Sequence, residues 1–303
     1  MRAIGIVLAG GNSKRMRELS NKRAIAAMPI AGSYRSVDFA LSNMSNSHIQ
    51  SVAVLTQYNS RSLNEHLSSS KWWDFGRKQG GLYVFTPTIT ADNGYWYRGT
   101  ADAIYQNINF IDNFDPDHII VLSGDQICTM DYDKMLQYHK EKGADCTISV
   151  LNVTYEEAKR FGIMNTDEDE RIYEFEEKPA EPKSTKASMG IYIFSWPVLK
   201  EALIKMKDEP GCDFGKHIIP YCHAAGKRIF AYEYNGYWKD VGTLGSYWEA
   251  NMELIDIIPE FNLYEEYWKI YTKSDIIPPQ FISEQSKIER SICLLYTSDA
   301  ADE

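Results

Sequence analysis

Residues 3–11 read Ala3-Ile4-Gly5-Ile6-Val7-Leu8-Ala9-Gly10-Gly11, a continuous apolar run that ends in a glycine pair. Such a run is typical of a parallel strand buried on both faces of a sheet. Two glycines at a strand end let backbone N–H groups approach a phosphate or a base closely, and an ordinary turn is the alternative interpretation. The loop matches neither the P-loop nor the G-x-G-x-x-G pattern. The stretch therefore predicts an α/β fold whose first strand ends at a candidate ligand site.

Strand and helix patterns alternate along the first half of the chain. They predict strands at residues 51–56, 118–122 and 146–151, and helices around 37–44, at 62–67, at 100–114 and from a cap at Asp131 to 142. This alternation favours a mostly parallel sheet with helices on both sides. The second half predicts a hairpin of residues 161–165 and 171–177, strands at 188–194, 228–234 and 237–241, and helices at 197–206 and 243–258.

Composition excludes several classes of protein. The 303 residues carry 32 Lys+Arg against 42 Asp+Glu, a formal net charge of −10, which argues against a nucleic-acid or anionic-membrane partner. No apolar stretch is long enough to span a membrane, and the apolar run near the N-terminus lacks a signal-peptide cleavage site. The 5 cysteines are scattered, as is typical of reduced thiols, and the 6 histidines lack zinc-ligand spacing. We expect a folded cytoplasmic protein.

Basic residues are concentrated just after the glycine pair, at Lys14, Arg15, Arg17, Lys22 and Arg23. In a chain of net charge −10, this cluster indicates a polyanionic ligand rather than a solvated face.

Two aspartates follow predicted strands. Asp125 lies directly after a buried strand, at the edge of the sheet where ligands of open α/β folds bind, and Asp240 ends a later strand. One or two carboxylates together with phosphate oxygens suit Mg²⁺. The alternative interpretation of Asp125 is a residue that caps a turn.

Two further segments are candidates for binding a sugar phosphate. Pro179 predicts an extended backbone at Lys178, so that the ammonium group points at a phosphate, and a cross-strand ion pair is the alternative. Residues 96–100 open a predicted helix whose first N–H groups and aromatic rings suit an anion and a sugar face, and packing of core aromatics is the alternative.

These segments belong to an ordered series of motifs that resembles the sugar-1-phosphate nucleotidyltransferases, and within them the glucose-1-phosphate adenylyltransferases of bacterial glycogen synthesis. The series is collinear from about residue 3 to 290. Besides the glycine loop it contains Asp38-Phe39-Ala40-Leu41-Ser42-Asn43, Ser123-Gly124-Asp125, Glu177-Lys178-Pro179 and Trp238-Lys239-Asp240-Val241-Gly242-Thr243, with further matches at residues 34–35, 55–58, 96–103, 160–164, 187–192 and 213–216.

The resemblance implies a Rossmann-like nucleotidyltransferase domain, α/β with a mixed, mostly parallel sheet, followed by a left-handed β-helix. We expect the first domain to cover residues 1–258, a linker 259–280, and the incomplete start of a truncated β-helix with an irregular tail 281–303. Residues 282–288 look like a first coil, whereas the small, acidic tail fits none. The full-length family assembles as homotetramers or heterotetramers.

The resemblance also implies transfer of AMP from ATP to glucose 1-phosphate, giving ADP-glucose and pyrophosphate. By position, the nucleotide would be bound by Leu8, Ala9, Gly10, Gly11, Arg15 and Gln57. Glucose 1-phosphate would be bound by Tyr97, Gly162, Glu177, Lys178, Ser188 and Asp213. Asp125 and Asp240 would hold the Mg²⁺ cofactor, and catalysis would rest on Arg15, Asp125 and Lys178. Lys22, Arg23 and Arg35 match the region where anionic sugar-phosphate activators bind in relatives.

The residue types suit this chemistry. The attacking phosphate oxygen is already ionised near neutral pH, since a phosphomonoester has a second pKa of about 6. The reaction therefore needs positioning and charge neutralisation rather than a general base.

Two positions depart from the family pattern. Ser13 stands where the loop usually has glycine, and Ile25 stands where catalytic subunits carry a lysine. These departures favour a second hypothesis, a non-catalytic modulatory subunit of the same enzyme.

Overall fold

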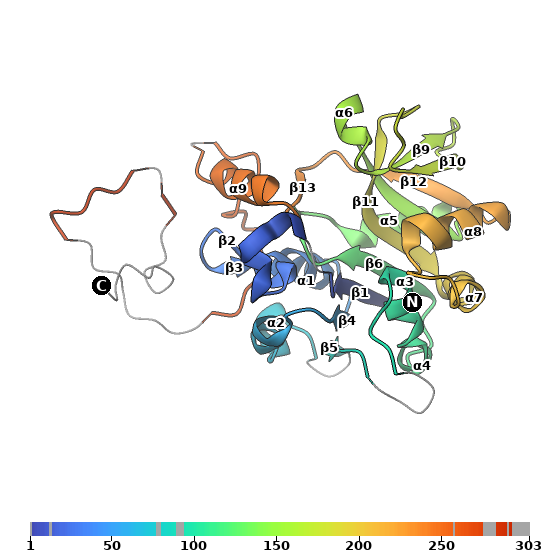
Figure 1. Cartoon of the computed structure of the whole chain (residues 1–303), viewed down its shortest axis with the longest axis horizontal. Coiled ribbons are helices and arrows are strands. Elements are labelled where there is room, and N and C mark those ends of the chain that lie inside the picture. The colour runs from blue at the N-terminus through green and yellow to red at the C-terminus, as the bar shows by residue number, and fades with distance from the viewer. Residues whose placement is uncertain are drawn as a thin grey trace.

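The chain is described from a computed structural model (Figure 1), which places residues 2–11, 14–76, 80–88, 94–256, 258–274, 283–289 and 291–292. A mixed sheet of nine strands runs through it in the order β10-β9-β11-β6-β1-β4-β5, with β8 paired to β11 and β12 paired to β8. The strands are β1 (Ala3–Ala9), β4 (Ser51–Thr56), β5 (Gly81–Phe85), β6 (His118–Ser123), β8 (Cys146–Asn152), β9 (Gly162–Thr166), β10 (Ile172–Glu177), β11 (Lys186–Ser195) and β12 (Ile229–Glu233). The α/β class is confirmed.

The first strand lies at the centre of the parallel half of the sheet. It pairs in parallel with β4 and β6, so that Val7 lies between Val54 and Leu122. Because side chains alternate along a strand, Ile6 enters the hydrophobic core on one face and Val7 enters the core on the other. The apolar run at residues 3–9 is thus explained by burial on both faces. Strand β11 is antiparallel to β6, β8 and β9, which makes the sheet mixed.

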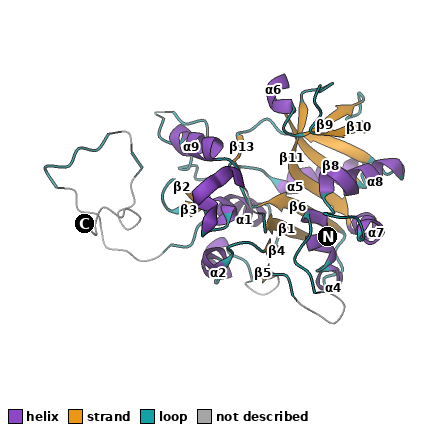
Figure 2. Ribbon diagram, in the orientation of Figure 1, coloured by secondary structure: helices purple, strands orange, loops and turns teal. Residues whose placement is uncertain are grey.

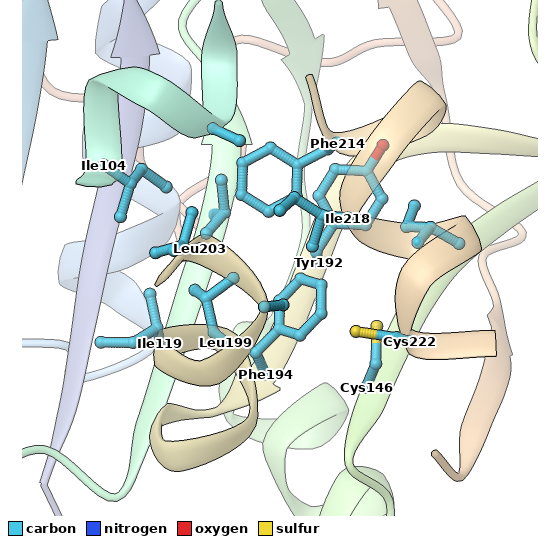
Figure 3. Close-up of a cluster of buried hydrophobic side chains, with 14 of the residues drawn as sticks. Ile104, Ile119, Cys146, Tyr192, Phe194, Leu199, Leu203, Phe214, Ile218 and Cys222 are labelled. Carbon is cyan, nitrogen blue, oxygen red and sulfur yellow. The ribbon is translucent and has the colours of Figure 1, made fainter. Parts of the chain in front are cut away.

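Helices cover both faces of the sheet (Figure 2). The helices are α1 (Ser36–Asn46), α2 (Arg61–His66), α3 (Thr100–Tyr105), α4 (Ile108–Asp112), α5 (Tyr132–Glu141), α6 (Tyr155–Ala158), α7 (Trp196–Met206), α8 (Ile219–Ala224) and α9 (Leu244–Glu253). Helices α3, α7 and α8 pack on one core, where Ile104, Leu203, Phe194 and Phe214 gather (Figure 3). Helices α1, α2 and α5 pack on the other core. In the part of the chain that the structure describes, no helix is long and apolar enough to cross a membrane.

Local sequence signals predicted several elements well. Asp131 caps α5 by accepting from the N–H groups of Asp133 and Lys134, and the hairpin of β9 and β10 forms as expected. Two helix predictions were wrong in extent. The helix expected at 100–114 breaks in two, because the side-chain amide of Asn107 donates to the Ala103 carbonyl and ends the first part. The helix expected to reach residue 258 ends at Glu253, ahead of Pro259.

A short ribbon lies beside the main sheet. Strands β7 (Gln126–Cys128) and β13 (Trp238–Asp240) pair antiparallel, with Asp240 opposite Gln126. The ribbon begins immediately after Asp125, and the N–H of Val241 donates to the Asp125 carbonyl at 3.0 Å. It thereby joins two segments that are far apart in the sequence.

Residues 258–274, which overlap the linker predicted at 259–280, lie against the domain rather than extending away from it. Phe261 and Ile270 are buried in a core with Phe39 of α1. We call residues 258–274 the strap. Most of residues 281–303, including Ile282 and the tail, lies outside the described residues, and residues 283–289 and 291–292 form neither helix nor strand. Cys128, Cys146, Cys212 and Cys222 are buried free thiols.

A buried histidine, His139, lies against the half-buried ring of His118. The ring of His139 is 1% exposed and lies 5.1 Å from that of His118. Its Nδ1 bonds to the Thr147 hydroxyl at 2.8 Å, and its Nε2 to the Ser195 hydroxyl at 3.3 Å. Burial, with a smaller contribution from His118, lowers the pKa of His139 from 6.5 to about 4.

We predict that this residue reduces stability on acidification. Between pH 6.5 and about 4, the histidine binds a proton in the unfolded chain but not in the folded one. The contribution of neutral His139 to the free energy of unfolding is therefore complete above pH 6.5 and is lost as the pH falls. In urea unfolding, the free energy of unfolding of wild type should fall by about 2 kcal/mol more between pH 7 and pH 5 than that of His139→Gln. His223→Gln, at an exposed position, should behave as wild type; equal pH dependence in all three proteins would contradict the prediction.

Candidate active site

A cavity of about 490 Å³ opens at the carboxyl ends of β1, β4 and β6. This is the edge at which open α/β sheets bind ligands. Its lining comprises Leu8, Gly10, Gly11, Leu55, Gln57, Tyr58, Tyr97, Arg98, Gly99, Thr100, Ala103, Ser123, Glu177, Gly190, Tyr192, Asp213, Phe214 and Gly215. The cavity thus brings together residues predicted for the nucleotide, at Gly10, Gly11 and Gln57, with residues predicted for the sugar phosphate, at Tyr97 and Asp213.

Gln57 connects the loop after β4 to the segment before α3 that carries Tyr97. Its Oε1 accepts from the Tyr97 N–H at 2.6 Å, and its Nε2 donates to the Tyr97 carbonyl at 3.2 Å. The Tyr97 hydroxyl in turn accepts from the amide of Asn107 at 3.0 Å, and burial raises the pKa of Tyr97. The sequence placed Gln57 at the nucleotide, and the structure shows that it also fixes the loop that carries Tyr97.

The two predicted carboxylates converge with an arginine around Gly242. A Cβ placed on Gly242 would lie 2.9 Å from Asp240 Oδ1, 3.6 Å from Asp125 Oδ2 and 3.7 Å from Arg15 Nη2. A side chain at position 242 would require the Asp240 carboxylate to shift, so glycine keeps this arrangement undisturbed. Ser123, which lines the cavity, donates to Asp125 through its hydroxyl. The Asp125 and Asp240 carboxylates therefore lie beside the cavity wall.

Electrostatics in this group favour a cation. Burial, and next the neighbouring Asp240 carboxylate, raise the pKa of Asp125 to about 6, against a smaller opposing effect of Arg15. Two carboxylates that repel each other at the end of a sheet form a donor set that fits Mg²⁺, which takes one or two protein carboxylates and fills its other positions with phosphate oxygens and water. No cluster of three or more His, Cys, Asp or Glu side chains occurs among the described residues, so a fully protein-made metal cage is not indicated there.

The opposite end of the cavity carries two more carboxylates. Glu177 Oε2 would lie 3.0 Å from a Cβ on Gly162 and 2.5 Å from one on Gly215, so the carboxylate sits between these two glycines. Asp213 accepts from the Thr100 hydroxyl at 3.1 Å and from the Gly215 N–H at 2.9 Å. Acceptors of this kind suit the hydroxyl groups of a sugar.

Lys178 and Ser188 lie outside the lining of this cavity as the described residues define it. The extended backbone predicted for Lys178 is wrong: its φ is 51°, in the left-handed region, because its N–H bonds to the Phe161 carbonyl at the end of the β9–β10 hairpin. Its ammonium group is largely exposed and lies 3.4 Å from Glu177 Oε1. Ser188 is buried, and its hydroxyl accepts from the Gly190 N–H.

Two aromatic lining residues lie within the matched motifs but were not predicted as site residues. The rings of Tyr192 and Phe214 stack at 5.4 Å with an angle of 11° between them. Trp238, outside the lining, has a buried indole N–H without a hydrogen-bond partner among the described residues. The motif matches point to these segments, and the three-dimensional packing shows which of their side chains face the cavity.

Comparison with known proteins agrees with this geometry. A family model for nucleotidyl transferases matches residues 4–257. A glucose-1-phosphate adenylyltransferase of Lachnospira eligens is 58% identical over 289 residues, 95% of this chain and 68% of the relative. Proteins of the same name from Clostridium novyi and Acetivibrio thermocellus are 52% and 49% identical, covering 95% and 97% of this chain and 76% and 71% of their own. The chain belongs to the glucose-1-phosphate adenylyltransferase family.

Of the two residues that depart from the family pattern, the structure describes Ile25 but not Ser13. Ile25 is 6% exposed and packs with Met16, Met28 and Tyr247, so it fills a small apolar cluster.

A second, smaller cavity of about 230 Å³ contains two of the three basic residues that match the activator region of the adenylyltransferase family. It is lined by Arg23, Arg35, Lys273, His66, Glu65, Ala27, Ser33 and Ser62. Lys22 is exposed and is not part of this lining as described. Lys273, which comes from the strap, was not predicted, because nothing in the sequence places it beside Arg23.

We predict that Asp125→Asn stabilises this adenylyltransferase fold without added metal. The raised pKa of Asp125 means that its ionised form costs stability at neutral pH. In denaturant unfolding at pH 7.5, the free energy of unfolding of Asp125→Asn should exceed that of wild type by about 1–3 kcal/mol. This difference should shrink as the pH falls below 6, because Asp125 of wild type then takes up a proton. Asp169→Asn, in the exposed hairpin turn, serves as control; a loss of stability in Asp125→Asn would contradict the electrostatic account.

Proposed function

We propose that this chain transfers AMP from ATP to glucose 1-phosphate, releasing pyrophosphate and forming ADP-glucose. One observation carries the proposal: a single cavity joins the glycine turn after β1 to Glu177 and Asp213, with the Asp125–Asp240 pair at its wall. A nucleotide and a sugar phosphate placed at these two ends meet between them.

The arrangement favours positioning over proton transfer. The described lining of the cavity contains two carboxylates, Glu177 and Asp213, which we assign to hydrogen bonds with sugar hydroxyls rather than to proton transfer. No general base is required, because a phosphate oxygen of glucose 1-phosphate is already ionised near neutral pH. Backbone N–H groups of Gly10 and Gly11 approach the nucleotide phosphates, while Glu177 and Asp213 accept hydrogen bonds from sugar hydroxyls.

Two anions must be brought together for this reaction. Arg15, close to the carboxylate pair, neutralises the triphosphate, and Lys178 reaches the sugar phosphate by leaving its 3.4 Å contact with Glu177. Mg²⁺, held by Asp125 and Asp240, would supply charge neutralisation and orientation of the phosphate groups. Four buried free thiols among the described residues suit a cytoplasmic enzyme, and we propose the tetrameric assembly of the family.

We expect the purified chain alone to release pyrophosphate from ATP and glucose 1-phosphate in the presence of Mg²⁺. Asp240→Asn should lower kcat at least about 10²-fold, since it removes a carboxylate from the candidate metal site. Glu168→Gln, in the exposed turn of the β9–β10 hairpin, is a control that leaves the carboxylate pair and the ribbon in place. A coupled pyrophosphate assay measures all three proteins.

The modulatory-subunit hypothesis makes the opposite prediction, and Ile25 is the residue that tests it. If wild type releases no pyrophosphate and Ile25→Lys does, the chain is a modulator and not an enzyme by itself. We expect instead that Ile25→Lys lowers stability, because it introduces an ammonium group into a cluster that is 6% exposed at this position.

We further propose that the smaller basic cavity binds an anionic sugar-phosphate activator. Arg35→Gln should weaken binding of a sugar bisphosphate about tenfold, the order expected from one charge-assisted hydrogen bond. Lys22→Gln is the matched control, since Lys22 is exposed and lies outside the described lining. Isothermal titration calorimetry distinguishes the two, and equal affinity in both variants would place the activator elsewhere.

A further inference from the structure

The motif at residues 38–43 is part of the resemblance, yet the proposed chemistry assigns it no role. Asp38, Ser42 and Asn43 on α1 are each 0% exposed. Buried polar groups of this kind are costly unless each finds a hydrogen-bond partner. Asp38 accepts from the Arg35 N–H at 2.7 Å, which caps α1, and contacts His66 Nε2 at 2.7 Å. Ser42 and Asn43 have partners in a different part of the chain.

The side-chain amide of Asn43 connects the strap to the ribbon. Its Oδ1 accepts from the indole N–H of Trp268 at 2.8 Å. Its Nδ2 donates to the backbone carbonyl of Cys128 at 3.0 Å. Both ends of one rigid planar group are therefore used, one toward the strap and one toward the last residue of β7.

The ribbon that Asn43 contacts carries Asp240 and begins immediately after Asp125. Cys128 lies opposite Trp238, and Asp240 lies opposite Gln126, the residue after Asp125. A pair of three-residue strands is not stable on its own and needs packing against another element. If β7 moves at Cys128, its pairing with β13 changes, and so does the distance between Asp125 and Asp240.

The strap is itself anchored at several other points. The Tyr271 N–H donates to the Ser42 hydroxyl at 2.8 Å, and its carbonyl accepts from the indole N–H of Trp73 at 3.1 Å. The amide of Asn46 donates to the Lys269 carbonyl at 3.0 Å. These bonds hold the strap on α1 without contacting the ribbon, so the strap gives Trp268 a fixed position from which to orient Asn43.

We propose that Asn43 is a positioning residue for the candidate metal site: held by Trp268, it fixes β7 and so sets the spacing of the Asp125 and Asp240 carboxylates. This inference rests on the proposed function, because it takes these carboxylates to be the metal ligands. It places part of the control of the site in the strap, outside the cavity and its lining.

The experiment compares Asn43→Ala and Trp268→Phe with Asn46→Ala, which also removes a strap hydrogen bond but leaves β7 untouched. Mn²⁺, a paramagnetic substitute for Mg²⁺, is titrated into each protein without nucleotide and followed by electron paramagnetic resonance. We expect binding about tenfold weaker in Asn43→Ala, the order found for loss of groups that orient metal ligands. Trp268→Phe, which loses the indole donor but keeps an aromatic ring, should show a smaller loss in the same direction, and Asn46→Ala should match wild type.

Hydrogen exchange provides a readout that does not depend on metal. Peptides covering residues 123–130 and 236–243 should exchange faster in Asn43→Ala and Trp268→Phe than in Asn46→Ala. If Asn43→Ala does not fold, Trp268→Phe decides the question.

The outcomes separate the two proposals. Mn²⁺ binding that is lost in Asp125→Asn but unchanged in Asn43→Ala and Trp268→Phe overturns the role of Asn43 and leaves the proposed function standing. Equal weakening in Asn46→Ala also overturns it, since the effect would then come from general loosening of the strap. If Asp125→Asn binds Mn²⁺ as wild type does, the metal site falls, and the inference falls with it.

Discussion

Repulsion between two carboxylates is the constraint around which this site is arranged. Asp125 and Asp240 come from distant parts of the chain and converge on the space left by Gly242, with Arg15 beside them. Burial and mutual repulsion raise the pKa of Asp125 to about 6, so the fold holds the pair together at a cost in stability. Such a cost persists only where surrounding structure fixes the geometry. The ribbon of β7 and β13 supplies this structure, and α1 supports the ribbon.

Different elements of the fold position the two ends of the cavity. The parallel strands bring the glycine turn and Ser123 to one edge, while the hairpin of β9 and β10 brings Glu177 to the far end of the cavity. Catalysis by positioning needs rigid elements, and the clamp of Gln57 on Tyr97 shows how side chains, too, are used to fix loops. Membership of the glucose-1-phosphate adenylyltransferase family is consistent with a site built from acceptors and cations rather than from a nucleophilic side chain.

The sequence predicted the parts of the fold that short-range physics decides. The apolar run of β1, the cap at Asp131 and the hairpin of β9 and β10 each depend on neighbouring residues, and each is present. It failed where one particular hydrogen bond, local or long-range, decides the backbone conformation. The helix after Thr100 ends at the amide of Asn107, and the backbone of Lys178 takes a positive φ through a bond to Phe161. The convergence on Gly242 and the basic cavity with Lys273 likewise depend on packing that no local pattern encodes.

The strap also bears on the order in which the molecule becomes functional during synthesis. A ribosome releases β1 and Asp125 long before Asp240, and Trp268 of the strap follows later still. The last strand of the main sheet, β12, ends at Glu233, so all nine strands are synthesised before Asp240 completes the carboxylate pair. The ribbon acquires β13 next, and Asn43 acquires its second partner only when the strap reaches α1. The segments of the two cores that flank the sheet are therefore synthesised before the strap that steadies the charged centre.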